Sequence, residues 1–456
     1  MSEKIHLPSH SRRQFLANSG KIVAASALAG VSIPFVHGAE TNTINIALVG
    51  AGGRGTGAAS NALSVKTGPT KLIAVADAFE DKLTKSCETL AGAHADKIDL
   101  GDRKFLGLDS YKQAMDTLRP GDIVILATPP AFRWVQFKYA IDKGLNVFME
   151  KPVTVDGPTT KRMLDLGAES EKKGLKVGVG LMCRHCPTRK EMFNRIQQGE
   201  IGDLILMRAY RQQAPIAMFR TEKRPAEMNE LDFQIRNFHS FLWASGGSYS
   251  DFFIHNIDEA CWMKNAWPIR AEASGGRHYR EDYIDQNFDT YSVEYTFADG
   301  SKFFFEGRNM EGCKDQFATY VHGAKGMGVV SSAGHAPAKS KLFKGQNIKS
   351  EDLIWQGPKE EANPYQEEWE NLTTAIRNNA PFNEVKRGAE VSLVTSMGRM
   401  AAHTGQTVTF DDMLNCPHEF APDLDKLQKG GPAPLLADAN GIYAVPTPGV
   451  KKKREY

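Results

Sequence analysis

INIALVGAGGRG, at residues 44–55, is typical of a buried parallel strand that runs into a glycine-rich turn. The turn has the pattern G-x-G-x-x-G, in which Gly50 permits a tight turn, Gly52 lets backbone N–H groups approach a pyrophosphate, and Gly55 lets the next helix pack on the strand. A phosphate would then lie at the N-terminus of that helix. The stretch predicts a dinucleotide site formed by Gly50, Gly52, Gly53, Arg54 and Gly55.

A second apolar run, residues 72–76, ends at Asp77. A carboxylate at this strand end can accept hydrogen bonds from both ribose hydroxyls and would repel a 2′-phosphate. We therefore expect NAD as the cofactor, with NADP less favoured. The alternative is that Asp77 is an ordinary acidic residue in a turn.

Strand and helix patterns alternate as the chain continues. Apolar runs at 122–128, 145–149 and 176–181 predict strands, and helical patterns at 132–143 and 157–173 separate them. This alternation predicts an α/β fold with an N-terminal, doubly wound parallel sheet.

Composition excludes several classes of protein. The chain has 456 residues, of which 41% are hydrophobic and 24% charged, as expected for two globular domains. Subtracting the net +3 of residues 1–38 from the overall +2 leaves −1, so the net charge of the remainder does not indicate binding to nucleic acid. The basic residues at 451–454 are expected to be a solvated tail rather than an anchor for a polyanion.

The first 38 residues have the organisation of an export signal. Ser11-Arg12-Arg13-Gln14-Phe15-Leu16 precedes an apolar, alanine-rich run at 22–36, with small residues at 38–39 where cleavage could occur. The arginine pair resembles the twin-arginine signal, whose machinery exports proteins that have already folded. We expect a periplasmic or otherwise exported protein, loaded with tightly held cofactor before export. The run is short for a membrane span, although an uncleaved anchor is an alternative.

Six cysteines in a chain of this length do not form a disulfide scaffold. Cys183 and Cys186 form a CxxC pair, but no second CxxC or HxxxH motif completes a zinc site. We predict no metal, and plain packing for the pair, with a redox or metal role as the alternative.

Two clusters could carry chemistry. Glu150-Lys151-Pro152 follows an expected parallel strand, at the sheet edge where ligands bind, and a lysine there can lower the pKa of a substrate hydroxyl. The proline leaves open a cis peptide after the lysine.

The second cluster is GGSYSDFFIHNID at residues 246–258. If residues from 250 onward form one helix, Asp251, His255 and Asp258 lie along one face. Oxidation of a secondary alcohol needs a base for the hydroxyl proton, a role that suits His255, while Asp251 could bind or orient the sugar. The alternatives are a core histidine satisfied by an aspartate, and a metal site.

Together these motifs resemble the glucose-fructose oxidoreductase / inositol dehydrogenase / MocA family, from about residue 44 to about residue 406. The specific marks are the strand with GAGGRG, ATPP at 127–130, EKPV at 150–153 and the GG-x3-D-x3-H-x2-D run. The resemblance implies a catalytic lysine at Lys151, an acid/base histidine at His255 and an acidic, substrate-binding partner at Asp251. It also implies that Arg184 lines the substrate site. It places Thr128, Pro129, Glu150 and Lys151 at the cofactor.

The resemblance further implies a Rossmann domain followed by an α+β domain with an open-faced, mostly antiparallel sheet that forms homodimers or homotetramers. Segments 204–212, 269–276, 287–297, 301–308 and 317–323 have suitable strand composition, and 364–379 or 385–404 could be a helix that returns to the nucleotide domain. The chain departs from the family pattern at Pro130 and Trp134, which puts the detailed nicotinamide contacts in doubt. Residues 324–362 are expected to be an insertion or a long loop that could lie over the site.

The expected organisation is a signal at 1–38, an NAD-binding domain at 39–181, a substrate and oligomerisation domain at 182–410 and an extension at 411–456. The expected activity is hydride transfer between tightly held NAD and a secondary hydroxyl of a sugar, sugar acid or glycoside. One alternative is an NAD-dependent glycosidase or lyase that oxidises the sugar transiently. Another is a non-catalytic module that binds sugar or dinucleotide.

Overall fold

The computed structural model describes residues 42–217, 220–278 and 283–456. The predicted export signal lies outside the described residues. Within these ranges, no helix has both the length and the apolar character that crossing a membrane requires.

Six parallel strands form the first sheet, in the order β3-β2-β1-β4-β5-β6. The order reverses beside β1, and the carboxyl ends of the strands there border a crevice of the kind that binds ligands. The strands are β1 (Ile44–Val49), β2 (Thr70–Asp77), β3 (Lys104–Leu106), β4 (Ile123–Leu126), β5 (Asn146–Met149) and β6 (Val177–Val179). The predicted doubly wound parallel sheet is confirmed.

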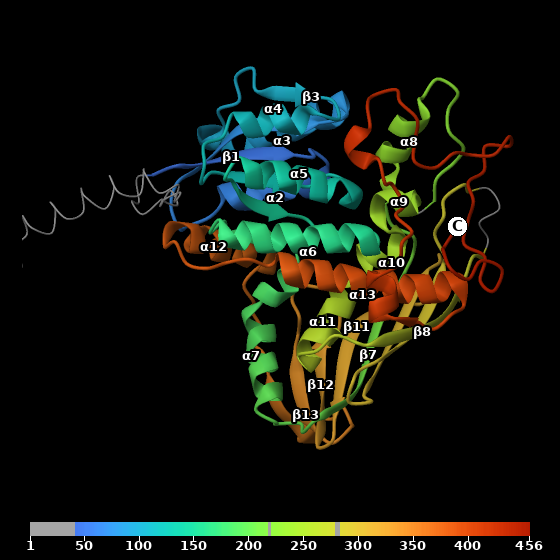
Figure 1. Ribbon diagram of the computed structural model, residues 1–456. Coiled ribbons are helices and arrows are strands. Elements are labelled where there is room, and N and C mark those ends of the chain that lie inside the picture. Colours follow the sequence, from blue (N-terminus) through green and yellow to red (C-terminus); the bar gives the residue numbers. More distant parts are fainter. Residues whose placement is uncertain (1–41, 218–219, 279–282) are drawn as a thin grey trace, which may run out of the picture.

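Helices connect these strands on both faces of the sheet (Figure 1). They are α2 (Gly53–Leu63), α3 (Glu80–His94), α4 (Ser110–Asp116), α5 (Arg133–Asp142) and α6 (Gly157–Lys172). The start of α6 is fixed by a capping box, in which the Asp156 side chain accepts a hydrogen bond from the Thr159 backbone N–H at 2.9 Å. This cap ends the segment that carries Lys151.

A mixed, mostly antiparallel sheet of nine strands follows, in the order β14-β13-β12-β11-β7-β10-β9-β8-β15. Only β7 and β10 pair in parallel among the strand pairs of the described sheet. The strands are β7 (Leu204–Gln213), β8 (Arg270–Gly276), β9 (Thr290–Thr296), β10 (Lys302–Asn309), β11 (Gln316–Gly323), β12 (Gly326–Ser331), β13 (Lys341–Lys344), β14 (Leu353–Gln356) and β15 (Val408–Thr409). All five predicted strands of this sheet are confirmed.

The prediction of an insertion or long loop at 324–362 is largely wrong, because β12, β13 and β14 extend the sheet there. The glycines that suggested a loop are packed inside the sheet. A Cβ at Gly326 would lie 2.3 Å from the Phe343 carbonyl oxygen, and one at Gly328 would lie 2.4 Å from the Met192 side chain. Glycine is needed in these strands for close packing rather than for a turn.

Further helices pack between and around the two sheets: α7 (Pro187–Gln197), α8 (Glu230–Arg236), α9 (Leu242–Ser245), α10 (Gly247–Phe252), α11 (Ile254–Lys264), α12 (Pro364–Arg377), α13 (Val385–Thr404) and α14 (Phe410–Leu414). Both candidate returning helices contact the nucleotide domain. On α12, Trp369 stacks on Phe148 of β5, with ring centroids 4.4 Å apart.

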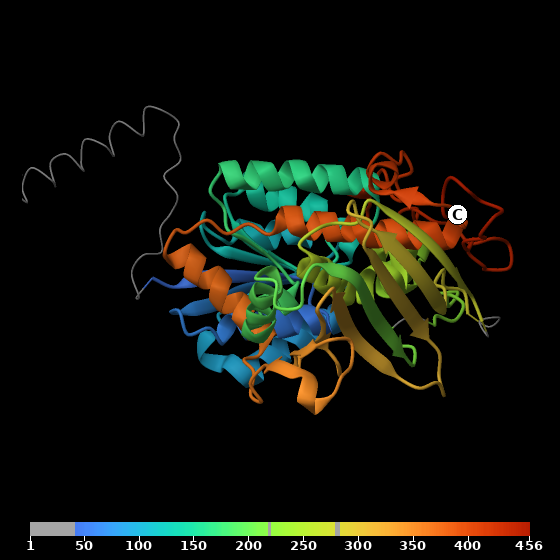
Figure 2. The same cartoon turned by 90° about the horizontal axis from the view of Figure 1, so that it is seen from below.

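Helix α13 lies between the two sheets. Its Ser392 hydroxyl accepts a hydrogen bond from the Val153 backbone N–H at 3.1 Å, and its Val394 carbonyl accepts one from the Tyr295 hydroxyl of β9 at 3.0 Å. Figure 1 shows α13 beneath α6, and Figure 2 shows it from below, between α6 and the strands of the second sheet. The two halves of the molecule are therefore packed on a shared helix.

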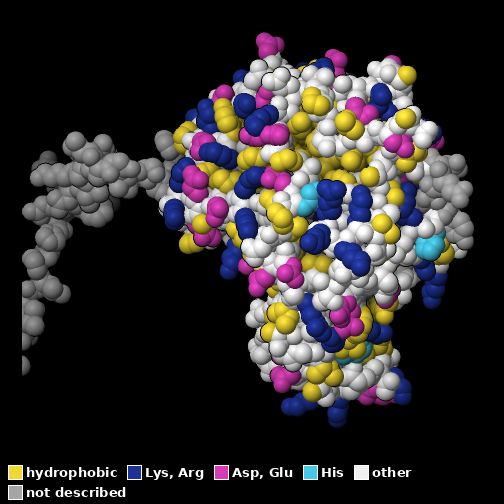
Figure 3. Space-filling model, turned by 45° about the vertical axis from the view of Figure 1, so that its right-hand side comes forward, with side chains coloured by type: hydrophobic (Ala, Val, Ile, Leu, Met, Phe, Trp, Pro, Cys, Tyr) yellow, Lys and Arg dark blue, Asp and Glu magenta, His cyan; other side chains and the backbone are white. Residues whose placement is uncertain are grey.

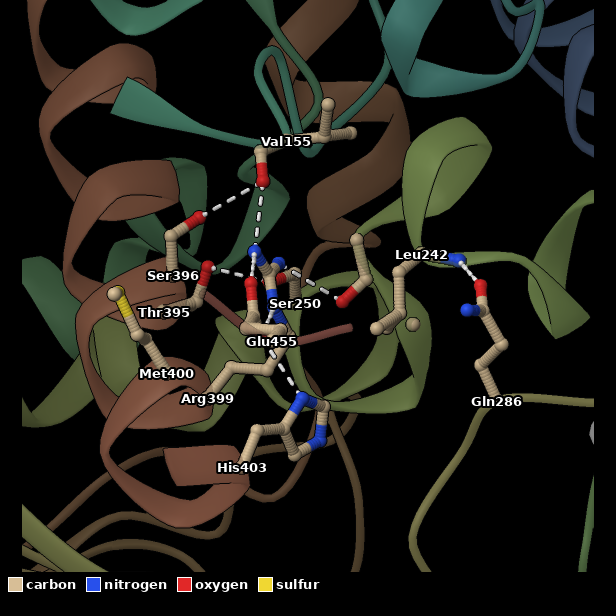
Figure 4. Close-up of polar contacts among 12 residues, drawn as sticks. Val155, Leu242, Ser250, Gln286, Thr395, Ser396, Arg399, Met400, His403 and Glu455 are labelled. Carbon is tan, nitrogen blue, oxygen red and sulfur yellow. Dashed lines mark hydrogen bonds and ion pairs between the residues drawn. The ribbon is translucent and has the colours of Figure 1, made fainter. Parts of the chain in front are cut away.

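One buried arginine of α13 joins segments that are far apart in the sequence (Figure 4). Arg399 donates hydrogen bonds to the Val155 carbonyl at 2.8 Å, the Gly246 carbonyl at 3.0 Å and the Ser250 hydroxyl at 2.8 Å. Val155 follows the EKPV motif, and Ser250 precedes Asp251. Arg399 thus ties both motifs to one helix.

Glu455 provides the negative charge that balances Arg399. Its carboxylate accepts hydrogen bonds from Arg399 Nε at 2.8 Å and Nη2 at 3.0 Å, and lies 2.8 Å from His403 Nδ1. Burial opposes ionisation of Glu455, but the charges of Arg399 and His403 outweigh it and lower its pKa to about 2. The extension therefore contributes a residue to the core.

The molecular surface carries both signs of charge. Figure 3 shows Lys and Arg side chains interspersed with Asp and Glu side chains over the face that it presents. In the closing basic segment, Lys452, Lys453 and Arg454 are exposed, but Glu455 directly after them is buried, so the segment is not a free, solvated tail.

We predict that Glu455→Gln destabilises the protein by about 3 to 5 kcal/mol, because it leaves the buried Arg399 without a counter-charge. Urea denaturation measures this loss. The difference in the free energy of unfolding between parent and variant should be largest at neutral pH. It should shrink as the pH falls from 4.5 towards 2, where the Glu455 carboxylate of the parent becomes protonated.

The matched control is Glu191→Gln, which removes the half-exposed pair with Arg195 and should cost less than about 1 kcal/mol. Equal effects of the two substitutions would contradict the assignment of Glu455 to the core.

Candidate active site

The glycine-rich turn has the geometry that a bound pyrophosphate requires. Gly50 has a φ of +93°, and a Cβ there would lie 2.5 Å from the Ala127 carbonyl carbon. A Cβ on Gly55 would lie 1.9 Å from the Gly50 carbonyl oxygen. Nothing lies within 4 Å of the Cβ position of Gly52 or Gly53, so the N-terminus of α2 is open to a ligand.

A cavity extends from this turn along the carboxyl ends of the strands. Gly50, Gly52, Asp77, Thr128 and Pro129 all line it, so the structure brings these predicted cofactor residues together. Its position at the strand-order reversal, beside the glycine-rich turn, is where a dinucleotide binds in sheets of this kind.

Asp77 is held firmly at the end of β2. Its carboxylate accepts hydrogen bonds from the backbone N–H of Ala51 at 2.6 Å and of Phe79 at 2.8 Å. Burial raises its pKa, and these bonds partly offset the effect. Lys82 also lines the cavity, with its Nζ 5.2 Å from the Phe79 ring centroid. The sequence analysis did not identify Lys82 or Phe79, because their positions depend on how α3 begins.

Arg54 and Glu150 form an ion pair instead of lining the cavity. Arg54 Nε lies 2.9 Å from Glu150 Oε1, and its guanidinium lies 4.9 Å from the Tyr365 ring centroid. Glu368 is buried next to this pair. Burial and the negative charge of Glu150 hold the pKa of Glu368 well above its usual value.

Lys151 and Asp251 are in contact, as their assignment to one site requires. Lys151 Nζ donates to the Asp251 carbonyl oxygen at 2.5 Å and lies 3.3 Å from Asp251 Oδ1. His239 Nε2 lies 2.9 Å from Asp251 Oδ2. Burial disfavours the Asp251 carboxylate, but Lys151 and His239 outweigh this and lower its pKa to about 2. The peptide between Lys151 and Pro152 is cis.

The predicted single helix through Asp251, His255 and Asp258 is wrong. Helix α10 ends at Phe252 and α11 begins at Ile254, with Phe253 in a turn between them. The break follows from tertiary packing, because the Phe253 ring fills the space beside Gly307 of β10. Asp251 therefore points to Lys151, whereas Asp258 makes a different contact.

Asp258 binds Arg184, the residue expected to line the substrate site. Arg184 donates to both carboxylate oxygens of Asp258, at 2.7 to 3.1 Å, and its guanidinium lies 5.4 Å from the Trp262 ring centroid. This pairing engages Nε and Nη2 of Arg184 within the protein.

His255 lies beside a second histidine. Its ring centroid is 4.4 Å from that of His335, in the turn between β12 and β13. Burial is the main reason why the pKa of His255 lies well below 6.5, and the neighbouring His335, Lys151 and Arg211 lower it further. His255 is thus a neutral imidazole at pH 7, able to accept a proton, and its Nδ1 has no hydrogen-bond partner among the described residues.

Sequence reasoning missed His239, His335 and Arg211. None belongs to a recognisable motif, and each reaches the site through a long-range contact. The expectation that part of 324–362 lies over the site holds for the turn that carries His335.

Cys183 and Cys186 are both buried free thiols. Cys183 Sγ lies 3.7 Å from His335 Nδ1, and burial raises the pKa of Cys183. No group of three or more His, Cys, Asp or Glu side chains suited to a metal ion occurs in the described residues. The packing interpretation of the pair agrees with these contacts.

Comparisons with known proteins agree with this geometry. Residues 44–181 match the family model described as "Oxidoreductase family, NAD-binding Rossmann fold". The scyllo-inositol 2-dehydrogenase (NAD(+)) of Bacillus subtilis is 30% identical over 184 residues, which cover 39% of this chain and 44% of that protein. The rhizopine catabolism protein MocA of Rhizobium meliloti is 21% identical over 43% of this chain and 55% of its own length. This chain thus spans about half the length of these curated relatives.

Solved structures share the fold. The scyllo-inositol dehydrogenase of Lactobacillus casei with bound NAD(H) and scyllo-inositol has a TM-score of 0.59 and 20% identity, covering 81% of this chain and 99% of that one. The aldose-aldose oxidoreductase of Caulobacter crescentus has a TM-score of 0.62 and 16% identity, covering 80% and 99%.

We predict that Gly55→Ala weakens NAD binding at least about tenfold, because the added methyl group pushes α2 away from the Gly50 carbonyl. Fluorescence titration of the purified protein with NAD measures the change. The matched control is Gly92→Ala in α3, where the Cβ position is open. This control should leave NAD binding unchanged and raise stability by up to about 1 kcal/mol. Parent-like affinity of the Gly55 variant would refute the proposed packing role of this glycine.

Proposed function

We propose that this chain, whose residues 44–181 form an NAD-binding Rossmann domain of the oxidoreductase family, oxidises a secondary hydroxyl of a sugar, sugar acid or related polyol. The observation that carries the proposal is a lysine ion-paired with Asp251, together with a buried, neutral histidine four residues after that aspartate. A module that only binds its ligand has no need of a proton acceptor at that position.

Lys151 would stabilise the developing alkoxide. Its Nζ is a cation anchored by the carbonyl and carboxylate of Asp251, and the contact of Asp251 with His239 restrains the carboxylate in turn. The lysine can therefore hydrogen-bond a substrate hydroxyl without leaving its own partner. A fixed positive charge in a buried site favours loss of the hydroxyl proton.

His255 would take that proton. Because burial keeps its imidazole neutral, the ring nitrogen is available as an acceptor at neutral pH. Bound NAD supplies the hydride acceptor, so the alcohol loses one hydride and one proton and becomes a ketone. Gly50, Gly52 and Asp77 would hold the dinucleotide, and Thr128 and Pro129 border the same cavity.

We predict that His255→Ala lowers turnover by roughly 10² to 10⁴ while NAD binding persists. The assay incubates the purified protein with NAD and a panel of inositols, aldoses and aldonic or uronic acids, and follows absorbance at 340 nm together with the products. In the parent, the acid limb of kcat/KM should lie below pH 6.5, because the base stays deprotonated down to its lowered pKa. His94→Ala, on the far helix α3, is the control.

If the His255 variant turns over as fast as the parent, His255 is not the catalytic base. Cleavage of a glycoside with no net change at 340 nm would replace the dehydrogenase by an NAD-dependent glycosidase or lyase.

We also propose export through the twin-arginine pathway, supported by Arg12 and Arg13 ahead of the apolar run. Cofactor acquired in the cytoplasm would then be retained, and turnover would use a second sugar or a carrier as acceptor.

Replacing both arginines by lysine should retain the protein inside the cell without changing its charge, as judged by fractionation and blotting. Lys21→Arg is the control for a conservative change elsewhere in the segment. Undiminished export of the double variant would exclude this pathway.

A further inference from the structure

A buried arginine of the second sheet lies next to the proposed site. Arg211 is on β7, on the same face as the buried Met207 and Ala209, and only 9% of its surface is exposed. Its guanidinium lies 3.8 Å from the centroid of the Phe317 ring on β11. The head group is therefore fixed by the sheet.

His335 connects Arg211 to the catalytic centre. Arg211 Nη1 lies 3.2 Å from His335 Nε2, and the His335 ring is 4.4 Å from the His255 ring. Because arginine is always a donor, His335 accepts at Nε2 and is held as the neutral tautomer with its proton on Nδ1. A group bound by Arg211 would thus lie one side chain away from the proposed base.

Arg211 differs from the neighbouring buried arginines in its partners. Arg184 has Asp258, Arg189 has Glu259 and Arg399 has Glu455 as a carboxylate partner. Arg211 forms no ion pair with an Asp or Glu of the described residues.

The other nitrogens of Arg211 also lack a protein acceptor. Its Nε is buried without a hydrogen-bond partner, and among the described residues Arg211 forms a hydrogen bond through Nη1 alone. Burial lowers the pKa of Arg211 to about 10. An unpaired cation in such surroundings is costly, which is expected where a ligand supplies the missing charge.

Carboxylates match this arrangement. The Nε and Nη2 edge of a guanidinium presents two parallel donors at the spacing of the two carboxylate oxygens. Lys151 is already paired with Asp251, whereas Arg211 has no carboxylate partner among the described residues.

We propose that Arg211 binds a carboxylate of the substrate, so that the enzyme acts on a sugar acid rather than on a neutral sugar or polyol. This inference rests on the proposed function and narrows its substrate class. His335 positions the guanidinium, and the carboxylate in turn orients the reacting hydroxyl towards Lys151 and His255.

The test measures binding by isothermal titration calorimetry to the full protein with NAD at pH 7, using matched pairs of ligands. The pairs are D-glucuronate and D-glucose, D-galacturonate and D-galactose, and D-gluconate and D-sorbitol. At least one acid should bind tenfold or more tightly than its neutral partner. Arg211→Met should abolish that preference, and Arg211→Lys should restore part of it. Arg270→Met, on the exposed side of β8, is the control.

Two further measurements separate the possible outcomes. NAD titration of Arg211→Met shows whether the variant is folded, and its thermal midpoint without sugar should equal or exceed that of the parent, because an unpaired buried charge is removed. A lowered midpoint would make Arg211 structural and overturn the proposal.

The proposal is also overturned if neutral sugars bind as tightly as the acids, if no acid binds, or if glucose 6-phosphate binds in preference to every carboxylate. If acids bind through Arg211 but NAD is not reduced, the carboxylate site is supported and the proposed oxidoreductase activity is refuted.

Discussion

The candidate site depends on one buried cation, Arg399, which holds together the segments that carry Lys151 and Asp251, from different parts of the chain. Its guanidinium binds the Val155 carbonyl after the EKPV motif, and the Gly246 carbonyl and Ser250 hydroxyl before Asp251. Three carbonyl or hydroxyl acceptors could not compensate the burial of this charge alone. Glu455, more than fifty residues further along the chain, supplies the negative charge that neutralises Arg399.

The contact between Lys151 and Asp251 follows from this arrangement. With both segments fixed, the lysine reaches the carbonyl and the carboxylate of Asp251, and His239 contacts the other carboxylate oxygen. The resulting set contains a charged lysine, an ionised aspartate and a neutral His255. In the proposed alcohol oxidation, charge stabilisation and proton acceptance would fall to different side chains, whose environments differ.

Much of the fold could be predicted because it is encoded locally. The buried strand β1, its glycine-rich turn and Asp77 at the end of β2 have patterns that do not depend on the rest of the chain, and the alternating strands of the second sheet are equally visible. The break at Phe253 could not be predicted, because it arises from packing on Gly307 more than fifty residues later. Strand β12 could not be predicted for the same reason. Its glycines are typical of a loop in the sequence, and only the long-range packing in the sheet explains them.

The residues of the candidate site also fall into a group that the sequence predicts and a group that it does not. Lys151, Asp251 and His255 belong to recognisable motifs, and the structure brings Lys151 and Asp251 into contact. His335 and Arg211 lie outside any motif. The folding of the second sheet places His335 beside His255 and Arg211 beside His335.

A crystal structure of the protein with NAD and a bound substrate tests the central claim most directly. The account predicts the nicotinamide ring at the carboxyl ends of β4 and β5, with its reactive carbon about 3 to 4 Å from the carbon to be oxidised. The hydroxyl on that carbon should lie within hydrogen-bonding distance of Lys151 Nζ and a nitrogen of His255. A nicotinamide directed away from these two side chains, or a substrate that touches neither, would contradict the account.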